Sequence, residues 1–281
     1  MSGPTWPNRA GSSVPPPGLF RATEGAARAP SGAPTRPVCL WSGPRNVSTA
    51  LMYAFAQRTD TRVVDEPLYA HYLRVSGADH PGRDDVLRAQ ENDGAKVVRD
   101  LVLGPCDRPV WFQKHMAHHL VELERAFLRQ TVNVLLIRDP AEVVLTLRHQ
   151  IAAPTIRDVG IKAQAELLDE LTAAGQAPPV LDAKELLTDP AGVLAELCRR
   201  VALPFDPAML AWPSGPRPFD GVWAPHWYQN VRKSTGFDAW RAKTEPMPVA
   251  LAPLAVECRP WYEKLMQHAI RARCPPTGAA S

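Results

Sequence analysis

The stretch from Val38 to Tyr53, VCLWSGPRNVSTALMY, constrains the fold of this chain more than any other. It opens with four apolar residues, passes through the turn residues Gly43 and Pro44, and continues with apolar residues at helical spacing. This pattern predicts a strand, a tight loop and a helix whose N-cap is formed by the hydroxyls of Ser48 and Thr49. A junction of this kind is typical of α/β proteins.

The predicted junction also has a chemical use, because the first amides of a helix have no backbone partner and point at one spot. The helix dipole adds partial positive charge there, Arg45 adds a full charge, and the two hydroxyls add donors. An anion with several oxygens would fit. The Walker A pattern is absent, since there is no Lys and only one Gly. An ordinary structural turn remains the alternative.

Composition limits the class of protein. The chain has 281 residues, with 45% hydrophobic and 22% charged residues, as in globular proteins. The net charge of +3 is too small to indicate a nucleic-acid partner. The sequence shows neither an apolar run long enough for a membrane span nor the apolar core of a signal peptide. Five scattered cysteines without a C-x-x-C pair favour reduced thiols, so we expect a cytoplasmic protein with no membrane partner.

The first part of the chain differs from the rest. Residues 1–36 hold seven prolines and a single acidic residue, Glu24, so we expect a disordered N-terminal tail. A transit peptide and an over-long start of the chain are the alternatives. We expect one α/β domain over residues 37–273 and a short C-terminal tail over 274–281.

Strand and helix patterns alternate along the predicted domain. Expected strands cover 38–41, 62–65, 94–98, 110–112, 132–137 and 180–182. Expected helices follow Pro67, which would take the first helical position, and cover 120–130, 141–150, 161–174, 191–201 and 261–272. The alternation predicts a three-layer α/β fold, a central parallel sheet flanked by helices.

Polar residues gather where expected strands end. Asp65 and Glu66 follow one strand and would either contact a ligand or cap the next helix. Lys114 and His115 follow another strand. Arg138, Asp139 and Pro140 follow the most apolar strand and form a second junction suited to phosphate.

Three segments, in this order, resemble the family of sulfotransferases that use 3′-phosphoadenosine 5′-phosphosulfate (PAPS). They are the loop at Pro44–Thr49, the turn from Arg138 to Thr146, and Arg232-Lys233-Ser234-Thr235-Gly236. A subgroup of similar proteins carries Trp-Ser-Gly-Pro-Arg-Asn-Val-Ser-Thr and Asp-Glu-Pro-Leu-Tyr, and some of its members are labelled aminotransferases. The resemblance extends over about residues 37–270 and implies a P-loop-like fold.

The resemblance implies a role for each matching position. Arg45 stands at the family's Lys position in the loop that holds the 5′-phosphosulfate, and Val47 replaces a Gly. Arg138 and Thr146 have the spacing of the 3′-phosphate segment. The residues implied to bind PAPS are therefore Arg45, Asn46, Val47, Ser48, Thr49, Arg138, Thr146, Arg232, Lys233 and Ser234.

The implied catalytic residues are His115 as the base, with Lys114 and Arg45 stabilising charge on the leaving phosphate. His118 is the second choice of base and, with Asp65 and Glu66, an expected contact of the acceptor. Each assignment has an alternative reading. His115, His118 and His119 could bind zinc, and Trp223, Trp227 and Tyr228 could be packing or a substrate wall.

We therefore expect a sulfotransferase that moves a sulfuryl group from PAPS to a hydroxyl or amine of a small-molecule acceptor, without a metal. A homodimer is compatible with this expectation. One rival is a kinase-like phosphotransferase whose Mg²⁺ is held by Asp65 or Asp139. The other rival is a nucleotide-binding module without catalytic activity.

Overall fold

A computed structural model describes residues 35–151 and 153–273 of the chain. The expected C-terminal tail and all but two residues of the expected N-terminal tail lie outside these ranges. The strands are β1 (Arg36–Ser42), β2 (Thr61–Asp65), β3 (Val110–Met116), β4 (Val132–Ile137), β5 (Val180–Asp182) and β6 (Ala269–Ile270).

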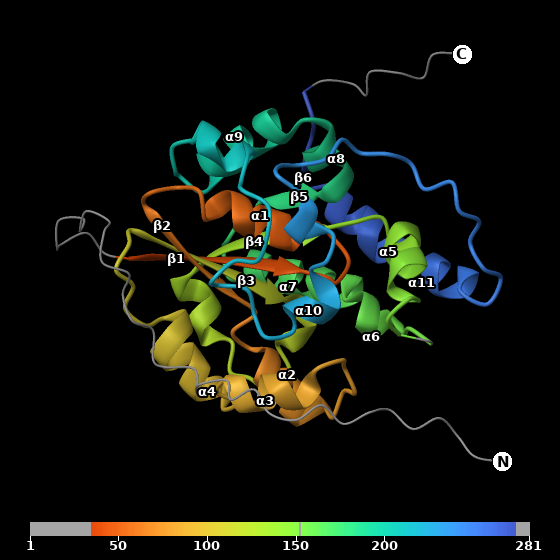
Figure 1. The fold of residues 1–281 in the computed structure, drawn as a ribbon, viewed down its shortest axis with the longest axis horizontal. Helices are drawn as coiled ribbons and strands as arrows, with labels where there is room; N and C mark the ends of the chain where they lie inside the picture. The colour runs from red at the N-terminus through yellow and green to blue at the C-terminus, as the bar shows by residue number, and fades with distance from the viewer. Residues whose placement is uncertain (1–34, 152, 274–281) are drawn as a thin grey trace.

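The helices alternate with these strands (Figure 1). The α-helices are α1 (Ser48–Phe55), α2 (Tyr69–Ser76), α3 (Arg83–Ala89), α4 (Gly94–Val97), α5 (Pro140–Leu147), α6 (Ile156–Val159), α7 (Ile161–Ala173), α8 (Ala183–Thr188), α9 (Pro190–Arg200), α10 (Ala224–Trp227) and α11 (Ala252–Met266). Shorter or irregular turns are η1 (Val98–Val102), η2 (Ala117–His119), η3 (Ala126–Gln130), η4 (Pro207–Leu210) and η5 (Val231–Lys233).

All described strands form one parallel sheet in the order β2-β3-β1-β4-β5-β6. The chain first winds from β1 past β3 to β2, and later continues on the other side of β1 with β4, β5 and β6. The winding direction thus changes at β1, and ligands of open α/β sheets bind at such a switch, beyond the carboxyl ends of the strands. The prediction of a central parallel sheet flanked by helices is confirmed.

Both faces of the sheet are covered, which explains the nearly continuous apolar runs of β1 and β4. One face packs against α1, α9 and η4, where Phe55 of α1 stacks on Phe112 of β3 with ring centroids 4.0 Å apart. The other face packs against α5, α7 and α11. A third apolar cluster joins α2 to the irregular segment 219–231, with Tyr72 and Trp223 fully buried in it. This cluster brings distant parts of the chain to the same end of the sheet.

Several expected elements were wrong. Residues 94–97 form the helical turn α4, and Val98 begins η1; Asp93 caps α4, because its carboxylate accepts hydrogen bonds from the amides of Ala95 and Lys96. The expected helix over 120–130 is only the short turn η3, and the last helix begins nine residues earlier, at Ala252. Pro67 is not the first helical residue, because α2 begins at Tyr69. The expected strand 110–112 continues to Met116, which places Lys114 and His115 inside it.

Within the described residues, none of the helices combines the length and the apolar character that crossing a membrane requires.

Candidate active site

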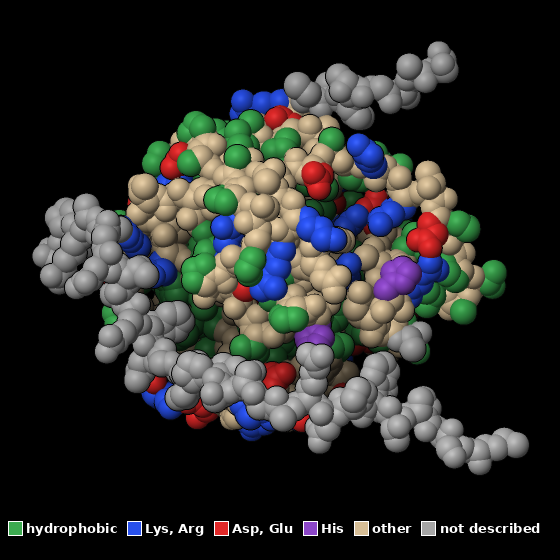
Figure 2. Space-filling view, in the orientation of Figure 1, with side chains coloured by type: hydrophobic (Ala, Val, Ile, Leu, Met, Phe, Trp, Pro, Cys, Tyr) green, Lys and Arg blue, Asp and Glu red, His purple; other side chains and the backbone are tan. Residues whose placement is uncertain are grey.

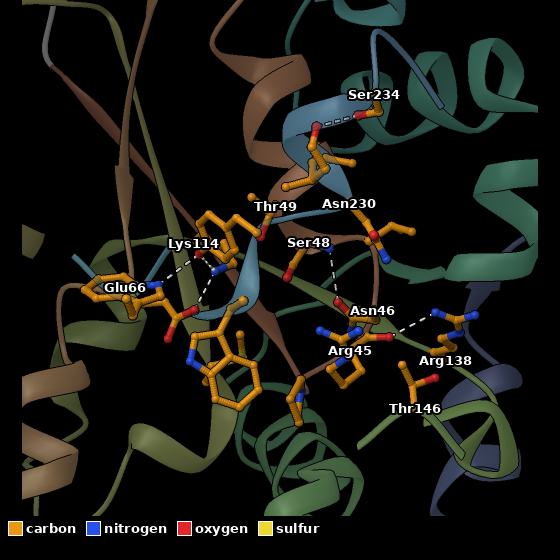
Figure 3. A pocket seen from close by; sticks show the side chains of 18 of the residues that line it. Arg45, Asn46, Ser48, Thr49, Glu66, Lys114, Arg138, Thr146, Asn230 and Ser234 are labelled. Atoms are coloured by element: carbon orange, nitrogen blue, oxygen red, sulfur yellow. Dashed lines mark hydrogen bonds and ion pairs between the residues drawn. The ribbon is translucent and has the colours of Figure 1, made fainter. Parts of the chain in front are cut away.

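A cavity of about 350 Å³ opens at the carboxyl ends of β1, β2, β3 and β4. Most of the residues predicted to form the site line it, namely Arg45, Asn46, Val47, Ser48, Thr49, Glu66, Lys114, His118, Arg138, Thr146 and Ser234. Figure 3 shows Glu66 and Lys114 on one side of the loop hydroxyls and Arg45, Arg138 and Thr146 on the other. Lys and Arg side chains also gather near the middle of the face seen in Figure 2.

The loop before α1 is held by backbone constraints and by one side chain. A Cβ at Gly43 would lie 2.6 Å from the carbonyl oxygen of Val159, so only glycine fits there. The side-chain Nδ2 of Asn46 donates to the carbonyl oxygen of Leu136 in β4 at 2.9 Å. The side-chain Oδ1 of Asn46 accepts from the backbone amide of Ser48 at 3.1 Å. The loop is therefore fixed to the neighbouring strand.

The expected N-cap hydroxyls are in fact the first two helical residues. Val47 precedes α1 without capping it through its side chain, and Ser48 and Thr49 line the cavity from the first turn. Because Asn46 already satisfies the amide of Ser48, the hydroxyls are not needed as caps. They are donors available to a ligand.

Two arginines meet beside this loop. Arg138 follows β4 and donates from Nη1 to the carbonyl oxygen of Arg45 at 2.9 Å. Burial, and then the charge of Arg138, lower the pKa of Arg45. Arg45 also has a left-handed backbone, with φ 56°, and its buried Nε has no hydrogen-bond partner among the described residues. A pair of close cations with an unsatisfied donor favours an anion between them.

Of the other residues predicted to contact the nucleotide, two line the cavity and two do not. Thr146 lines it near Arg138, while Arg138 also pairs with Glu142 at 2.7 Å. Ser234 lines it too. Arg232 pairs instead with Asp220 at 2.8 Å. Neither Arg232 nor its neighbour Lys233 is among the cavity-lining residues.

Lys114 is fully buried and its ammonium group is saturated. Its Nζ donates to Asp65 Oδ1 at 2.8 Å, to Glu66 Oε1 at 2.5 Å and to the hydroxyl of Tyr228 at 2.8 Å. Burial alone would lower the pKa of Lys114, but the charges of Asp65 and Glu66 raise it well above its usual value. An ammonium group has three donors, so none is left for a leaving phosphate. Because its partners take all three donors, Lys114 is not expected to stabilise the leaving phosphate, and this corrects the role expected from the sequence.

Asp65 and Glu66 neither cap α2 nor stand free, because both carboxylates bind Lys114. Asp65 lies behind the cavity wall, where its Oδ2 accepts from the hydroxyl of Tyr228 at 2.6 Å. Glu66 lines the cavity and has a left-handed backbone with φ 40°. Burial raises the pKa of Glu66 to about 6, against the opposing charge of Lys114 and with the charge of Asp65. Its Oε2 has no hydrogen-bond partner among the described residues.

The histidine predicted to be the base does not reach the cavity. His115 is fully buried and stacks on Trp41 with ring centroids 4.3 Å apart. Burial, and then the charge of Lys114, lower its pKa to about 3. His115 lies within β3, not after it, so its side chain projects onto the covered face of the sheet beside Trp41, which speaks against its expected role as the base. His118, the second choice, lines the cavity, and burial lowers its pKa to about 3.

The three histidines do not form one cluster, because His118 and His119 pack edge to face with ring centroids 4.7 Å apart while His115 lies elsewhere. His119 stacks on Tyr72, with ring centroids 4.6 Å apart, whereas His115 stacks on Trp41. Among the residues that the structure describes, no group of three or more His, Cys, Asp or Glu side chains could hold a metal ion.

Aromatic side chains line the Glu66 side of the cavity. They are Tyr69, His80, His118, His119, Trp223, Trp227 and Tyr228. Tyr69 packs edge-on against Trp223, with ring centroids 5.1 Å apart. Sequence reasoning left the tryptophans open between packing and a substrate wall, and it missed Tyr69 and His80 as wall residues. The sequence signal for Tyr69 was only the aromatic-rich segment after the Asp-Glu-Pro turn, and His80 lies beyond that segment in a polar loop.

Comparison with known proteins supplies a family. A family model described as "Sulfotransferase domain" matches residues 37–269 of this chain. Two curated proteins of Arabidopsis thaliana, "Branched-chain-amino-acid aminotransferase-like protein 2" and "Branched-chain-amino-acid aminotransferase-like protein 1", are each 38% identical over 229 residues. These matches cover 81% of this chain but only 41% of either relative, so the chain spans about two fifths of their length.

Two solved structures also align with the chain. The "Sulfotransferase Domain from the Curacin Biosynthetic Pathway" is 14% identical, with a TM-score of 0.49, and the match covers 81% of this chain and 99% of that one. A sulfotransferase from Alicyclobacillus acidocaldarius is 13% identical, with a TM-score of 0.48, covering 83% and 95%.

Proposed function

Since this chain belongs to the sulfotransferase domain family, we propose that it moves a sulfuryl group from PAPS to a hydroxyl of a small-molecule acceptor. The observation that carries the proposal is the pair of cations at the loop before α1. Arg45 and Arg138 meet there, and Arg45 keeps a buried donor without a partner among the described residues. An anion with several oxygens would satisfy the unpaired Nε of Arg45 and could take the remaining N–H donors of Arg138, which also binds Glu142 and the carbonyl of Arg45.

The surrounding donors suit the two ends of PAPS. Arg45, the hydroxyls of Ser48 and Thr49, and the first amides of α1 would hold the 5′-phosphosulfate. Arg138 and Thr146 lie on the far side of Arg45 and would hold the 3′-phosphate. The chemistry that PAPS supplies is a sulfuryl group whose transfer leaves 3′-phosphoadenosine 5′-phosphate (PAP).

Within this proposal Arg45 takes the role expected of a catalytic cation. Its guanidinium would stabilise the charge that develops on the 5′-phosphate as the sulfur–oxygen bond to that phosphate breaks. Arg45 is only partly exposed, which strengthens such a contact. Lys114 does not share this task, because its three donors are taken by Asp65, Glu66 and Tyr228.

We assign the base to Glu66 in place of His115. Glu66 lines the cavity, whereas His115 stacks on Trp41 behind it. A base with a pKa near 6 is ionised at neutral pH and still accepts a proton readily, and burial gives Glu66 this value. Glu66 would take the proton of the acceptor hydroxyl while the oxygen of that hydroxyl forms its bond to sulfur. His118 also lines the cavity, but a pKa of about 3 makes it a weaker base.

Calorimetric titration of the purified protein with PAP, and separately with ADP and Mg²⁺, tests the donor. We expect PAP to bind with a micromolar Kd and ADP not to bind. Binding of ADP that needs Mg²⁺ would support a kinase-like enzyme instead, and binding of neither nucleotide would contradict a catalytic anion site.

The position of the 3′-phosphate has its own test. We expect Arg138→Ala to weaken PAP binding by roughly tenfold to a hundredfold, since it removes a charge-assisted contact. The variant should leave the weaker binding of adenosine 5′-phosphosulfate, which lacks the 3′-phosphate, unchanged. An equal loss for both nucleotides would refute the assignment of Arg138 to that phosphate.

A further inference from the structure

The Glu66 side of the cavity combines a net negative charge with aromatic walls, and we propose that it selects an acceptor that carries a positively charged amine in addition to its hydroxyl. The proposal rests on the proposed function and names the class of its acceptor. It follows from three features of the described residues, which are the charge balance at Lys114, the rings that form the wall, and polar atoms that lack partners.

The charge balance follows from the buried group around Lys114. This single cation is shared by two carboxylates, those of Asp65 and Glu66, at 2.8 Å and 2.5 Å. The group therefore carries a net charge of −1 when both carboxylates are ionised. The nearby histidines do not offset it, because burial lowers the pKa values of His118 and His119 and keeps both rings neutral. A cation placed here is attracted, and a carboxylate is repelled.

The opposite side of the cavity has the reverse sign. Arg45 and Arg138 line it, and Arg138 keeps Glu142 as a partner at 2.7 Å, so Arg45 is the cation there without a paired carboxylate among the described residues. Figure 3 shows the arginines separated from Glu66 by the hydroxyls of the loop. An acceptor with an anionic group would therefore be drawn to the nucleotide side, whereas the ammonium group of a cationic acceptor is directed toward the aromatic wall beside Glu66.

The wall beside Glu66 consists of ring faces and edges. Tyr69, Trp223 and Trp227 line it together with His80. Tyr69 is fixed by contacts on two sides, edge-on to Trp223 and parallel to His119, each with ring centroids 5.1 Å apart. Electron-rich ring faces attract ammonium groups, most strongly when water is excluded. Trp227 is only half-buried and stands at the wall without a hydrogen bond that fixes its indole.

Polar atoms in the same wall lack partners. Nδ1 of His119 and Nε1 of Trp227 are buried without a hydrogen bond among the described residues, although both residues line the cavity. His119 itself is 1% exposed. Such atoms are costly to leave unpaired, so they favour a ligand with polar groups over a purely apolar one. The ammonium group of an amino alcohol or amino phenol can donate to an unprotonated Nδ1 of His119, which the alkyl part of a hydrocarbon alcohol cannot do, whereas the indole N–H of Trp227 needs an acceptor such as the hydroxyl.

A series of three phenols of matched size separates charge from shape. Tyramine carries an ammonium group, 4-propylphenol is neutral, and 3-(4-hydroxyphenyl)propionate carries a carboxylate. Calorimetry would measure the Kd of each for the PAP-loaded protein. We expect tyramine to bind roughly tenfold more tightly than 4-propylphenol, the size of a cation–π and charge contribution, and the carboxylate to bind most weakly.

A variant at the wall tests the source of the preference. Trp227→Leu removes an aromatic face from a half-buried position, so the fold should tolerate it. We expect the preference for tyramine over 4-propylphenol to fall to about threefold or less, and Trp227→Phe to retain most of it. The Kd of PAP should stay unchanged in both variants.

The phenol series, the PAP titration and the Trp227 variants each have an outcome that would overturn part of the inference. Equal binding of the three phenols, no binding of any of them, or the tightest binding of the carboxylate would overturn the inference while PAP binding left the proposed function standing. Failure of PAP to bind would instead remove the proposed function, and the inference with it. Retention of the full preference in Trp227→Leu would refute the aromatic wall as its source.

Discussion

Glu66 shows how a residue acquires a chemical role from its surroundings. Its left-handed backbone turns the side chain from the end of β2 into the cavity, and such a conformation in a non-glycine residue is a strain that often marks a functional position. Lys114 holds one carboxylate oxygen, while burial raises the pKa. The same residue in an exposed loop would be an ordinary acidic side chain.

Glu66→Gln should abolish turnover, by about a thousandfold, and leave the Kd of PAP unchanged, because the amide keeps the shape but accepts no proton. His115→Ala is the matched comparison and should retain turnover if the enzyme folds, since His115 does not line the cavity. Steady-state rates and PAP calorimetry on both variants would check this. Retained turnover in Glu66→Gln would move the base to His118 or elsewhere.

The pH dependence of turnover follows from the same residue. Glu66 must be ionised to accept a proton, so turnover should rise with pH through about 6 and level off above it. With an unperturbed glutamate the rise would lie near pH 4.5, and with His118 as base it would lie near 3. A profile of kcat between pH 4.5 and 8 measures the midpoint. A flat profile over this range would contradict the assignment.

The loop between β1 and α1 works as one element because Asn46 ties it in two directions. Its side chain accepts from the amide of Ser48 and donates to the carbonyl of Leu136. The first bond shapes the turn, and the second fixes the turn to β4, the strand that carries Arg138. The two arginines therefore keep their spacing without a direct bond between their side chains.

Asn46→Ala should lower the free energy of unfolding by about 1–2 kcal/mol and weaken PAP binding, since both hydrogen bonds are lost. Asn46→Asp keeps an acceptor for the Ser48 amide but loses the donor to Leu136, so its stability should fall less. Its new negative charge beside Arg45 should weaken PAP binding more. Urea denaturation and calorimetry would test both variants, and equal stability of all three proteins would show that the ties are unimportant.

The elements that could be predicted from the sequence are those with strong local signals. The apolar run Val132–Ile137 and the junction at Gly43–Thr49 predicted two central strands and the loop that leads into α1. Residues 94–98 and 120–130 misled because short apolar pairs do not distinguish strand, helix and turn. The burial of His115 and the saturation of Lys114 depend on partners at distant positions, such as Trp41 and Tyr228, and spacing along the chain cannot reveal them.

At the scale of the whole molecule, Lys114 joins three parts of the chain. It lies on β3, its carboxylate partners end β2, and Tyr228 belongs to the segment that follows α10. The indole of Trp223 donates to the same Tyr228 hydroxyl at 3.0 Å, and the third apolar cluster surrounds it. The wall of the cavity is thereby attached to the sheet through one buried ion group.

Lys114→Met should lower the free energy of unfolding by about 3–5 kcal/mol, because it leaves two buried carboxylates without a counter-ion. The loss should become smaller as the pH falls, because removal of the lysine that lowers the pKa of Glu66 lets this carboxylate take up a proton at a higher pH than in the wild-type protein. Lys114→Arg keeps the charge and should lose less. Urea denaturation at pH 5.5 and 7.5 measures the free energy of unfolding of both variants. A loss below about 1 kcal/mol in Lys114→Met would contradict the idea that the two carboxylates need a buried counter-ion.

The reversal of winding at β1 has a consequence for how such a molecule can diversify. The strands on one side of β1 end in Glu66 and the residues near His118, and the strand on the other side ends in Arg138. Under the proposed function, the side chains that would contact the acceptor come from residues 61–119 and 223–228, and those that would hold the nucleotide come mainly from the loop of β1 and residues 132–147. Substitutions in the first set can change what is modified while the donor stays the same.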